Sequence, residues 1–528
     1  MDDVAVLPRP TRLGRGGGRF VLDATTTVSG SGPGAGAAAS LLRALLAPAT
    51  GLWLAPGGEE ASIRLVDEDS DPASERYVLR VRPEGIELSS PGPRGLLNGI
   101  QSLRQLLPAG IYSPGPRRET WAVPEVEIED EPRFSWRGAM LDVSRHFAPL
   151  DFLYRFVDVL AMHKLNVFHL HLNDDQGWRF ASSRYPRLVE IGAWRAQTRV
   201  GHQRDKAFAD VYDGTPHGGY YAQSQLRSLV AYAAARNVTI VPEIDLPGHA
   251  QAAIAAYPEL GNVGPLEVWE RWGVNPHVLN LETGTVQFCK DIWDEVIDVF
   301  PSRYVHLGGD ECPRTEWRST PAMQRRAAAL GVSVDGLQNW FTRQLATHLL
   351  AAGRVPVGWD EILEGGELPK GATVMSWRGE QGGIVAASEG FDVVMCPERP
   401  CYFDHYQSER PDEPLAIGRL NTLEDVYGYE PVPEALAPEQ ARHVLGTQLT
   451  LWREYLPDTR HVEYMALPRL CALAEVAWSA PGRELGEFMG RLSHQLGRFD
   501  ELGLNYRPLD GPLPAQRGGT GVRRRFDP

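Results

Sequence analysis

The sequence predicts an α/β fold in which a smaller α+β domain precedes a (β/α)8, or TIM, barrel. Three observations support this prediction. The chain of 528 residues is longer than one hydrophobic core usually serves, so two domains are expected. From Phe134 onward, strand-like and helix-like patterns alternate repeatedly. Carboxylates and tryptophans follow the expected strands, as at the catalytic end of a barrel.

Residues 1–132 are expected to form the N-terminal α+β domain. Apolar residues at a spacing of two predict strands, and apolar residues at helical spacing predict helices. The predicted strands include Ile63–Val66 and Tyr77–Val81, and the predicted helices are Ala35–Leu46 and Gly95–Leu107. We interpret the acidic stretch Glu125–Glu131, closed by Pro132, as the domain boundary.

Residues 133–510 are expected to form the barrel, because eight strand-like segments occur there with helical patterns between many of them. The expected strands are Gly138–Ser144, Asn166–Leu172, Val238–Ile244, Tyr304–Leu307, Val355–Gly358, Thr373–Trp377, Asp392–Met395 and Val444–Leu451. The expected helices include Asp151–His163, Gln225–Arg236, Val286–Phe300 and Asp335–Ala352. A doubly wound sheet is the alternative, although that architecture rarely needs eight units.

Two long excursions, residues 179–222 and 397–442, follow the second and seventh expected strands. In a barrel such loops emerge at the carboxyl ends of the strands, where substrates bind. The C-terminal tail, residues 511–528, contains Arg523–Arg525 and is expected to be flexible.

Composition excludes several classes of partner. The formal net charge of −15 argues against nucleic acid, which requires a basic surface. No run of 18 apolar residues is present, so a membrane span is not expected. The start Met1-Asp2-Asp3-Val4 lacks the features of a signal peptide. We therefore expect a cytoplasmic protein, or a secreted one if a signal peptide was removed.

The cysteine pattern favours packed thiols over a zinc site or a disulfide framework. Five cysteines are present, an odd number, and none has CxxC spacing. Cys396 and Cys401 are close enough in sequence to leave one disulfide open.

Carboxylates, an arginine and aromatic residues gather after the expected strands. In strand order they are Asp142 and Arg145, Asp174, Asp245 and His249, Asp310 and Glu311, Trp359, Trp377, Tyr402 and Asp404, and Trp452 and Glu454. Aromatic faces stack on pyranose rings, while carboxylates and arginine bind hydroxyl groups. A ring of these residues predicts a carbohydrate pocket.

The adjacent pair Asp310-Glu311 indicates the chemistry. Ordinary retaining glycosidases place two carboxyl groups about 5–5.5 Å apart, across the scissile bond. Neighbouring residues of one strand point to opposite faces, so this pair fits an acid and a nucleophile poorly. The pair fits substrate assistance, in which the 2-acetamido carbonyl attacks its own anomeric carbon and forms an oxazolinium intermediate.

Ordered motifs across 134–480 resemble those of family 20 glycoside hydrolases, the β-N-acetylhexosaminidases. The motifs are GAMLDVSRHF at Gly138–Phe147, HLHLNDDQGWR at His169–Arg179, PEIDLPGH at Pro242–His249, HLGGDE at His306–Glu311, GWDE at Gly358–Glu361, SWRG at Ser376–Gly379, YFD at Tyr402–Asp404 and LWRE at Leu451–Glu454. Asn173 departs from the Ser or Thr that is common before the paired aspartates.

The resemblance implies a role for each matching residue. Glu311 would be the general acid and base, Asp310 would hold the acetamido N–H, and Tyr402 would orient the acetamido carbonyl. The remaining implied roles are pocket walls for Trp359, Trp377 and Trp452, hydroxyl binding for Arg145, Asp404 and Glu454, and support of the catalytic carboxylates for Asp174 and His249. A general acid must keep its proton near the working pH, so the pKa of Glu311 is expected to be raised by burial beside Asp310.

The implied partner is an oligosaccharide or glycoconjugate that ends in a 2-acetamido sugar, with no cofactor and no metal. A metal site of Asp174, His249, Asp310 and Glu311 is the alternative for these residues, since carboxylate and imidazole suit divalent ions. For the whole protein, the alternatives are a non-catalytic sugar-binding protein on the same fold and disaccharide release of the lacto-N-biosidase type. GlcNAc or GalNAc preference and the oligomeric state stay open.

Overall fold

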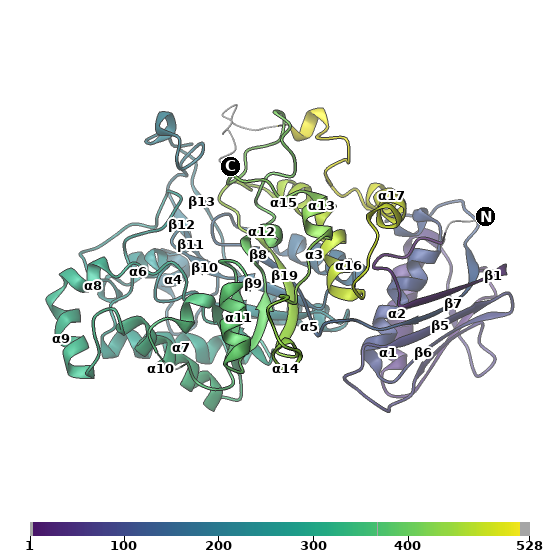
Figure 1. Ribbon diagram of the computed structural model, residues 1–528. Helices are drawn as coiled ribbons and strands as arrows, with labels where there is room; N and C mark the ends of the chain where they lie inside the picture. Colours follow the sequence, from purple (N-terminus) through teal and green to yellow (C-terminus); the bar gives the residue numbers. More distant parts are fainter. Residues whose placement is uncertain (1–3, 367, 518–528) are drawn as a thin grey trace.

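The computed structural model describes residues 4–366 and 368–517, and it begins with a seven-stranded sheet in the order β1-β7-β5-β6-β4-β2-β3. These strands are β1 Arg12–Val21, β2 Thr27–Ser31, β3 Ala55–Pro56, β4 Ile63–Asp67, β5 Tyr77–Arg82, β6 Gly85–Ser90 and β7 Ala122–Asp130. Two helices, α1 (Ala35–Thr50) and α2 (Pro93–Leu106), pack on one face of this sheet (Figure 1).

The opposite face of the N-terminal sheet carries ion pairs between strands, such as Arg80 Nε to Glu127 Oε1 at 3.0 Å. The acidic stretch Glu125–Glu131, which we interpret as the domain boundary, forms most of β7, the last strand of the N-terminal sheet along the chain. Its acidic residues alternate with buried Val126 and Ile128, so the period of two is that of a strand with one solvated face.

The following strands close into a parallel barrel in the order β14-β15-β16-β17-β18-β19-β8-β9, which confirms the predicted fold class. Their bounds are β8 Trp136–Asp142, β9 Val167–His171, β14 Thr239–Glu243, β15 Tyr304–His306, β16 Val355–Trp359, β17 Thr373–Ser376, β18 Asp392–Met395 and β19 Val444–Leu451. All eight expected segments overlap these strands.

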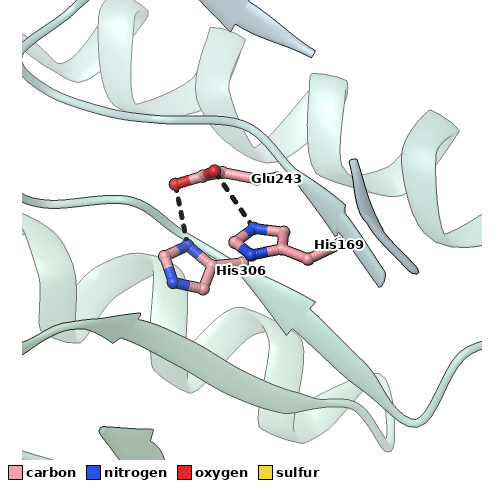
Figure 2. A group of neighbouring side chains, drawn as sticks. All are labelled: His169, Glu243 and His306. Carbon is pink, nitrogen blue, oxygen red and sulfur yellow. Dashed lines mark ion pairs between the residues drawn. The ribbon is translucent and has the colours of Figure 1, made fainter. Parts of the chain in front are cut away.

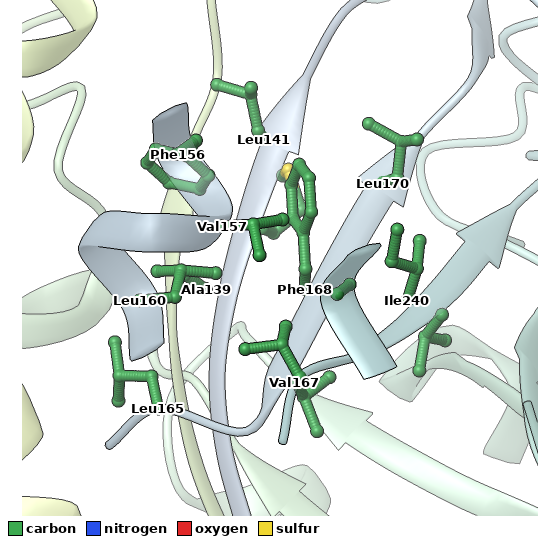
Figure 3. Close-up of a cluster of buried hydrophobic side chains, with 14 of the residues drawn as sticks. Ala139, Leu141, Phe156, Val157, Leu160, Leu165, Val167, Phe168, Leu170 and Ile240 are labelled. Carbon is green, nitrogen blue, oxygen red and sulfur yellow. The ribbon is translucent and has the colours of Figure 1, made fainter. Parts of the chain in front are cut away.

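Helices cover the outside of the barrel. Those between strands include α3 Leu150–Met162, α5 Gln223–Ala234, α6 Gln251–Ala256, α7 Thr283–Val299, α8 Thr315–Ser319, α9 Pro321–Leu330, α10 Leu337–Ala351 and α11 Gln381–Ser388. Three more follow the last strand: α15 Thr459–Ala466, α16 Arg469–Trp478 and α17 Leu485–Leu502. Figure 3 shows the packing of α3 through Phe156, Val157 and Leu160 against apolar side chains of β8 and β9.

A buried ion pair joins the N-terminal sheet to the barrel. Asp130, at the end of β7, accepts hydrogen bonds from Lys164 Nζ at 2.8 Å, Tyr77 Oη at 2.7 Å and Trp478 Nε1 at 2.9 Å. Lys164 follows α3 and Trp478 ends α16, so one carboxylate holds three elements together. Figure 1 shows α16 and α17 on the side of the barrel that faces the sheet.

The excursions carry only short elements. The short hairpin of β10 Asn173–Asp174 and β11 Gly177–Trp178 precedes the first excursion, which contains α4 Arg187–Glu190, β12 Trp194–Arg195 and β13 His217–Gly218. The second contains α12 Glu398–Cys401, α13 Leu423–Tyr427 and α14 Pro438–Ala441. In the tail, Gln516 Nε2 donates to Asn505 Oδ1 at 3.0 Å. Residues 518–528, with Arg523–Arg525, lie outside the described residues.

Membrane-spanning helices and disulfide bonds were both considered from the sequence. The helices of the described residues include none with the length and apolarity that crossing a bilayer requires. All five cysteines are free thiols, so Cys396 and Cys401 are not paired.

Candidate active site

A cavity of about 350 Å³ opens at the carboxyl ends of the barrel strands. Eight of the eleven predicted site residues line it: Arg145, Asp310, Glu311, Trp377, Tyr402, Asp404, Trp452 and Glu454. They come from the ends of β8, β15, β17, β18 and β19, which explains how residues hundreds of positions apart meet. The other three, Asp174, His249 and Trp359, are buried and are not among its lining residues.

Asp310 and Glu311 lie in a turn beyond β15, not in the strand itself. Asp310 Oδ2 and Glu311 Oε2 are each 3.7 Å from His249 Nε2, so both carboxylates are close to one imidazole. Because the two residues lie beyond the strand, the expected alternation of strand faces does not apply to this pair. The turn depends on Gly308, which has φ of 69° and whose absent Cβ would lie 1.7 Å from Asp245 Oδ1.

The two neighbouring carboxylates differ in exposure. The side chain of Asp310 is 11% exposed and that of Glu311 is 39% exposed, so only Glu311 is open to a departing group. Burial is the largest cause that raises the pKa of Glu311; the charge of Asp310 also raises it, while His249 opposes the shift. The direction is the one expected of a group that must hold a proton.

A chain of charged contacts stands behind the pair. Asp174 Oδ1 is 3.1 Å from His249 Nδ1, and Asp174 Oδ2 is 2.8 Å from Arg145 Nη2 and 2.9 Å from His171 Nε2. Burial would raise the pKa of Asp174, but Arg145 and His249 lower it. Asp174 is thus a buried anion shared by three cationic groups.

Several buried oxygens at the cavity have no hydrogen-bond partner among the described residues. They are both carboxylate oxygens of Asp404, Glu454 Oε2 and Asp310 Oδ1. Burial and the mutual repulsion of Asp404 and Glu454 raise the pKa of Asp404, and burial raises that of Glu454. Because native proteins rarely leave buried polar atoms unsatisfied, these oxygens indicate where a polar ligand binds.

Aromatic rings enclose the cavity. Trp377 stacks on Tyr402 with ring centroids 6.1 Å apart, and the Trp377 indole N–H donates to Glu361 Oε2 at 3.0 Å. Trp452 lies 4.9 Å from the Arg145 guanidinium. Trp359 lies beneath, with its ring centroid 5.9 Å from that of Trp452, and so supports the wall without lining the cavity.

Residues of both excursions complete the rim, and sequence reasoning did not single them out. They are Gln203 and Arg204 from the first excursion, and His405, Ile417, Gly418 and Arg419 from the second, together with Glu398. The length of the excursions predicts that they reach the site, but no motif marks these positions.

Four buried groups have metal-ligating side chains close together, including Asp245, His249 and Asp310, and His169, Glu243 and His306. In the second group each histidine nitrogen already lies 2.9–3.0 Å from a Glu243 oxygen (Figure 2). These are hydrogen-bonding distances between the side chains themselves. In this group the side chains are therefore paired with one another, and the absence of a metal site stays a prediction.

A parallel barrel whose strand ends present paired carboxylates and aromatic walls around a cavity fits a glycoside hydrolase. Residues 134–481 match the model of the glycosyl hydrolase family 20 catalytic domain, and residues 3–131 match domain 2 of that family. The chain belongs to glycosyl hydrolase family 20.

Similar proteins carry related names. The chain is 40% identical to a β-hexosaminidase of Porphyromonas gingivalis, over 98% of this chain and 66% of that protein's length. It is 34% identical to a β-N-acetylhexosaminidase of Cellulomonas fimi, over 96% of each. A GH20 β-N-acetylhexosaminidase structure from Streptomyces coelicolor A3(2) superposes with a TM-score of 0.83 at 31% identity, over 97% of this chain and 98% of that one.

Proposed function

We propose that the protein is a retaining exo-β-N-acetylhexosaminidase that removes terminal β-linked GlcNAc or GalNAc by substrate-assisted catalysis. The observation that carries the proposal is the cavity itself, in which unsatisfied carboxylate oxygens lie beside the Asp310-Glu311 pair. The relatives named as hexosaminidases support the same activity.

Glu311 is the general acid and base of this proposal. Its raised pKa keeps a proton available, and its exposure lets it reach the glycosidic oxygen. The proton passes to the leaving oxygen as the bond from the anomeric carbon breaks. Glu311, now ionised, then takes a proton from the water that opens the intermediate.

The substrate supplies the nucleophile. Asp310 and Glu311 are both close to the same imidazole, so they approach from one side, whereas an acid and a protein nucleophile must flank the scissile bond. The acetamido oxygen instead attacks the anomeric carbon, with Asp310 accepting from its N–H and Tyr402 donating to its carbonyl. An attached nucleophile reaches effective molarities of about 10⁵–10⁸ M.

The other lining residues account for release of one sugar at a time. A cavity of about 350 Å³ is near the small end of the roughly 300–1,000 Å³ typical of ligand pockets. Arg145, Asp404 and Glu454 face the hydroxyl groups, and Trp377 and Trp452 cover the ring and the acetamido group. This division supports terminal removal over disaccharide release.

The test is hydrolysis of p-nitrophenyl β-N-acetylglucosaminide and the matching β-glucoside at mildly acidic pH. We expect strong turnover of the acetamido sugar and almost none of the glucoside. Comparable rates on the two substrates would agree with a glycosidase but would contradict substrate assistance. Folded protein that cleaves neither would favour the sugar-binding alternative, and release of disaccharide alone from an oligosaccharide would overturn the exo assignment.

A further inference from the structure

Glu243, the last residue of β14, is a fully buried carboxylate that the proposed mechanism does not use. Its Oε2 is 2.6 Å from His171 Nδ1 and 3.0 Å from His169 Nε2. Its Oε1 is 2.9 Å from His306 Nδ1 and accepts the Trp359 indole N–H at 2.9 Å. Figure 2 shows His169 of β9 and His306 of β15, the two strands that flank β14, converging on Glu243.

One arm of contacts runs from Glu243 to the catalytic pair. His171 joins Glu243 to Asp174, Asp174 joins His171 to His249, and His249 Nε2 is 3.7 Å from both Asp310 and Glu311. Charges alternate along this arm. Burial would lower the pKa of His171, but the charge of Glu243, supported by the hydrogen bonds with Asp174 and Glu243, raises it well above its usual value.

A second arm runs from Glu243 to the cavity wall. Its hydrogen bond fixes the indole of Trp359, which is 1% exposed. The Trp359 ring packs against Trp452, which lines the cavity and lies over Arg145. One buried carboxylate therefore holds both a wall of the cavity and the support of the acid.

We propose that Glu243 is a positioning residue that keeps His171 positively charged, and thereby fixes Asp174 and His249 against Asp310 and Glu311. Without the Glu243 anion, a fully buried imidazole has too little compensation to stay charged. Asp174 then loses one of the three cations that fix its orientation, and His249 loses its anchor. The effect on turnover rests on the proposed function, whereas the charge of His171 does not.

The first experiment reads that charge directly. Histidine-selective ¹⁵N NMR at mildly acidic pH, with the His171 signals assigned from a His171→Gln variant, is recorded for the wild type and for Glu243→Gln. We expect His171 to be an imidazolium in the wild type and neutral in Glu243→Gln. A His171 imidazolium that persists in the variant would overturn the proposal, whether or not the protein cleaves any glycoside.

The second experiment uses turnover of the acetamido glycoside. For Glu243→Gln we expect kcat to fall about 10- to 100-fold. Losses of that size are typical when a buried group that orients an active-site side chain is removed, as is known for metal-binding sites. His249 lowers the pKa of Glu311, so its displacement should move the alkaline limb of kcat/KM to higher pH. An unshifted profile with unchanged kcat would contradict the proposal. Failure of the wild type on acetamido sugars would instead contradict the proposed function.

Variants of each arm and a matched control separate positioning from general damage. His171→Gln should reproduce the shifted pH profile. Trp359→Phe, which removes the indole N–H bonded to Glu243 and part of the ring packed on Trp452, should change KM without that shift. Glu475 is equally buried and accepts from Tyr427 Oη at 2.9 Å, away from the cavity. Glu475→Gln should lower stability and leave the pH profile in place. A shift in the control as large as in Glu243→Gln would overturn the proposal.

Discussion

Carboxylates are buried in two regions of the molecule, and the regions differ in whether the carboxylate oxygens have hydrogen-bond partners. At the junction of the sheet and the barrel, both oxygens of Asp130 accept hydrogen bonds, from Trp478 on one side and from Tyr77 and Lys164 on the other. At the barrel mouth, Asp404 has no partner for either oxygen, and Asp310 has none for Oδ1, among the residues that the structure describes.

The difference separates a structural carboxylate from a functional one. A satisfied buried ion pair requires no ligand, so the contacts of Asp130 explain its burial completely. The oxygens at the barrel mouth have no partner among the described residues, and they border the cavity, where water or a bound ligand can satisfy them. Substitution should therefore damage stability in the first region and activity in the second.

The largest loss of stability is expected for Asp130→Asn. Removing this charge leaves Lys164 buried and unpaired, which typically costs about 3–5 kcal/mol. Urea unfolding followed by fluorescence measures the loss, and kcat/KM per folded molecule should be unchanged. A stability within error of the wild type would place Asp130 in the same class as the pocket carboxylates.

The largest loss of activity is expected for Glu311→Gln. Loss of the general acid should lower kcat/KM about 10²–10⁴-fold on glycosides with poor leaving groups. The loss should be smaller with p-nitrophenol, which departs without protonation. The unfolding midpoint should hardly move, because the side chain is partly exposed. Equal losses on both kinds of substrate would remove Glu311 from the acid role.

Glu361, next to the cavity residue Trp377, should make the free energy of unfolding depend on pH. Burial, with the charge of Asp310, raises the pKa of Glu361 from 4.5 to about 8. The native state then binds this proton more tightly than the unfolded state, so stability should fall as pH rises from about 4.5 to 8, by at most on the order of 5 kcal/mol. Glu361→Gln should flatten this decline in unfolding free energy measured across that range, and an unchanged slope would contradict the assignment.

The smallest effect is expected where charges are exposed. Arg80 pairs with Glu127 on the solvated face of the N-terminal sheet, where both side chains are about 40% exposed. Arg80→Ala should change stability by about 0–1 kcal/mol, and added salt should reduce the difference further. A larger decrease in the unfolding free energy, measured with denaturant, would show that the Arg80–Glu127 pair is less exposed to solvent than the structure indicates.

Residue patterns were enough to predict the barrel, since each strand is a short apolar run bounded by polar residues. The eight expected strands overlap β8, β9 and β14 to β19 with shifts of at most two residues at their ends. At Glu125–Glu131 we predicted a domain boundary from the acidic composition, but we did not predict that these residues form a strand. The alternation of the acidic residues with buried Val126 and Ile128 is the signal that indicates the strand.

The site residues could be predicted because they follow strands, but their contacts could not. The turn that brings Asp310 and Glu311 to one imidazole depends on Gly308 and on Asp245 from another strand. The same holds for Glu243, whose importance comes from three histidines and a tryptophan on three other strands, β9, β15 and β16. Contacts of this kind arise only when the barrel closes.

The nucleophile is the central claim, and one series of substrates tests it most directly. We would measure kcat/KM for aryl glycosides whose 2-acetamido group carries zero to three fluorine atoms, under identical conditions. Fluorine withdraws electron density from the carbonyl oxygen, so substrate assistance predicts a steep, progressive fall in rate along the series. A nearly flat series would contradict the account, because a nucleophile supplied by the protein would not depend on that oxygen.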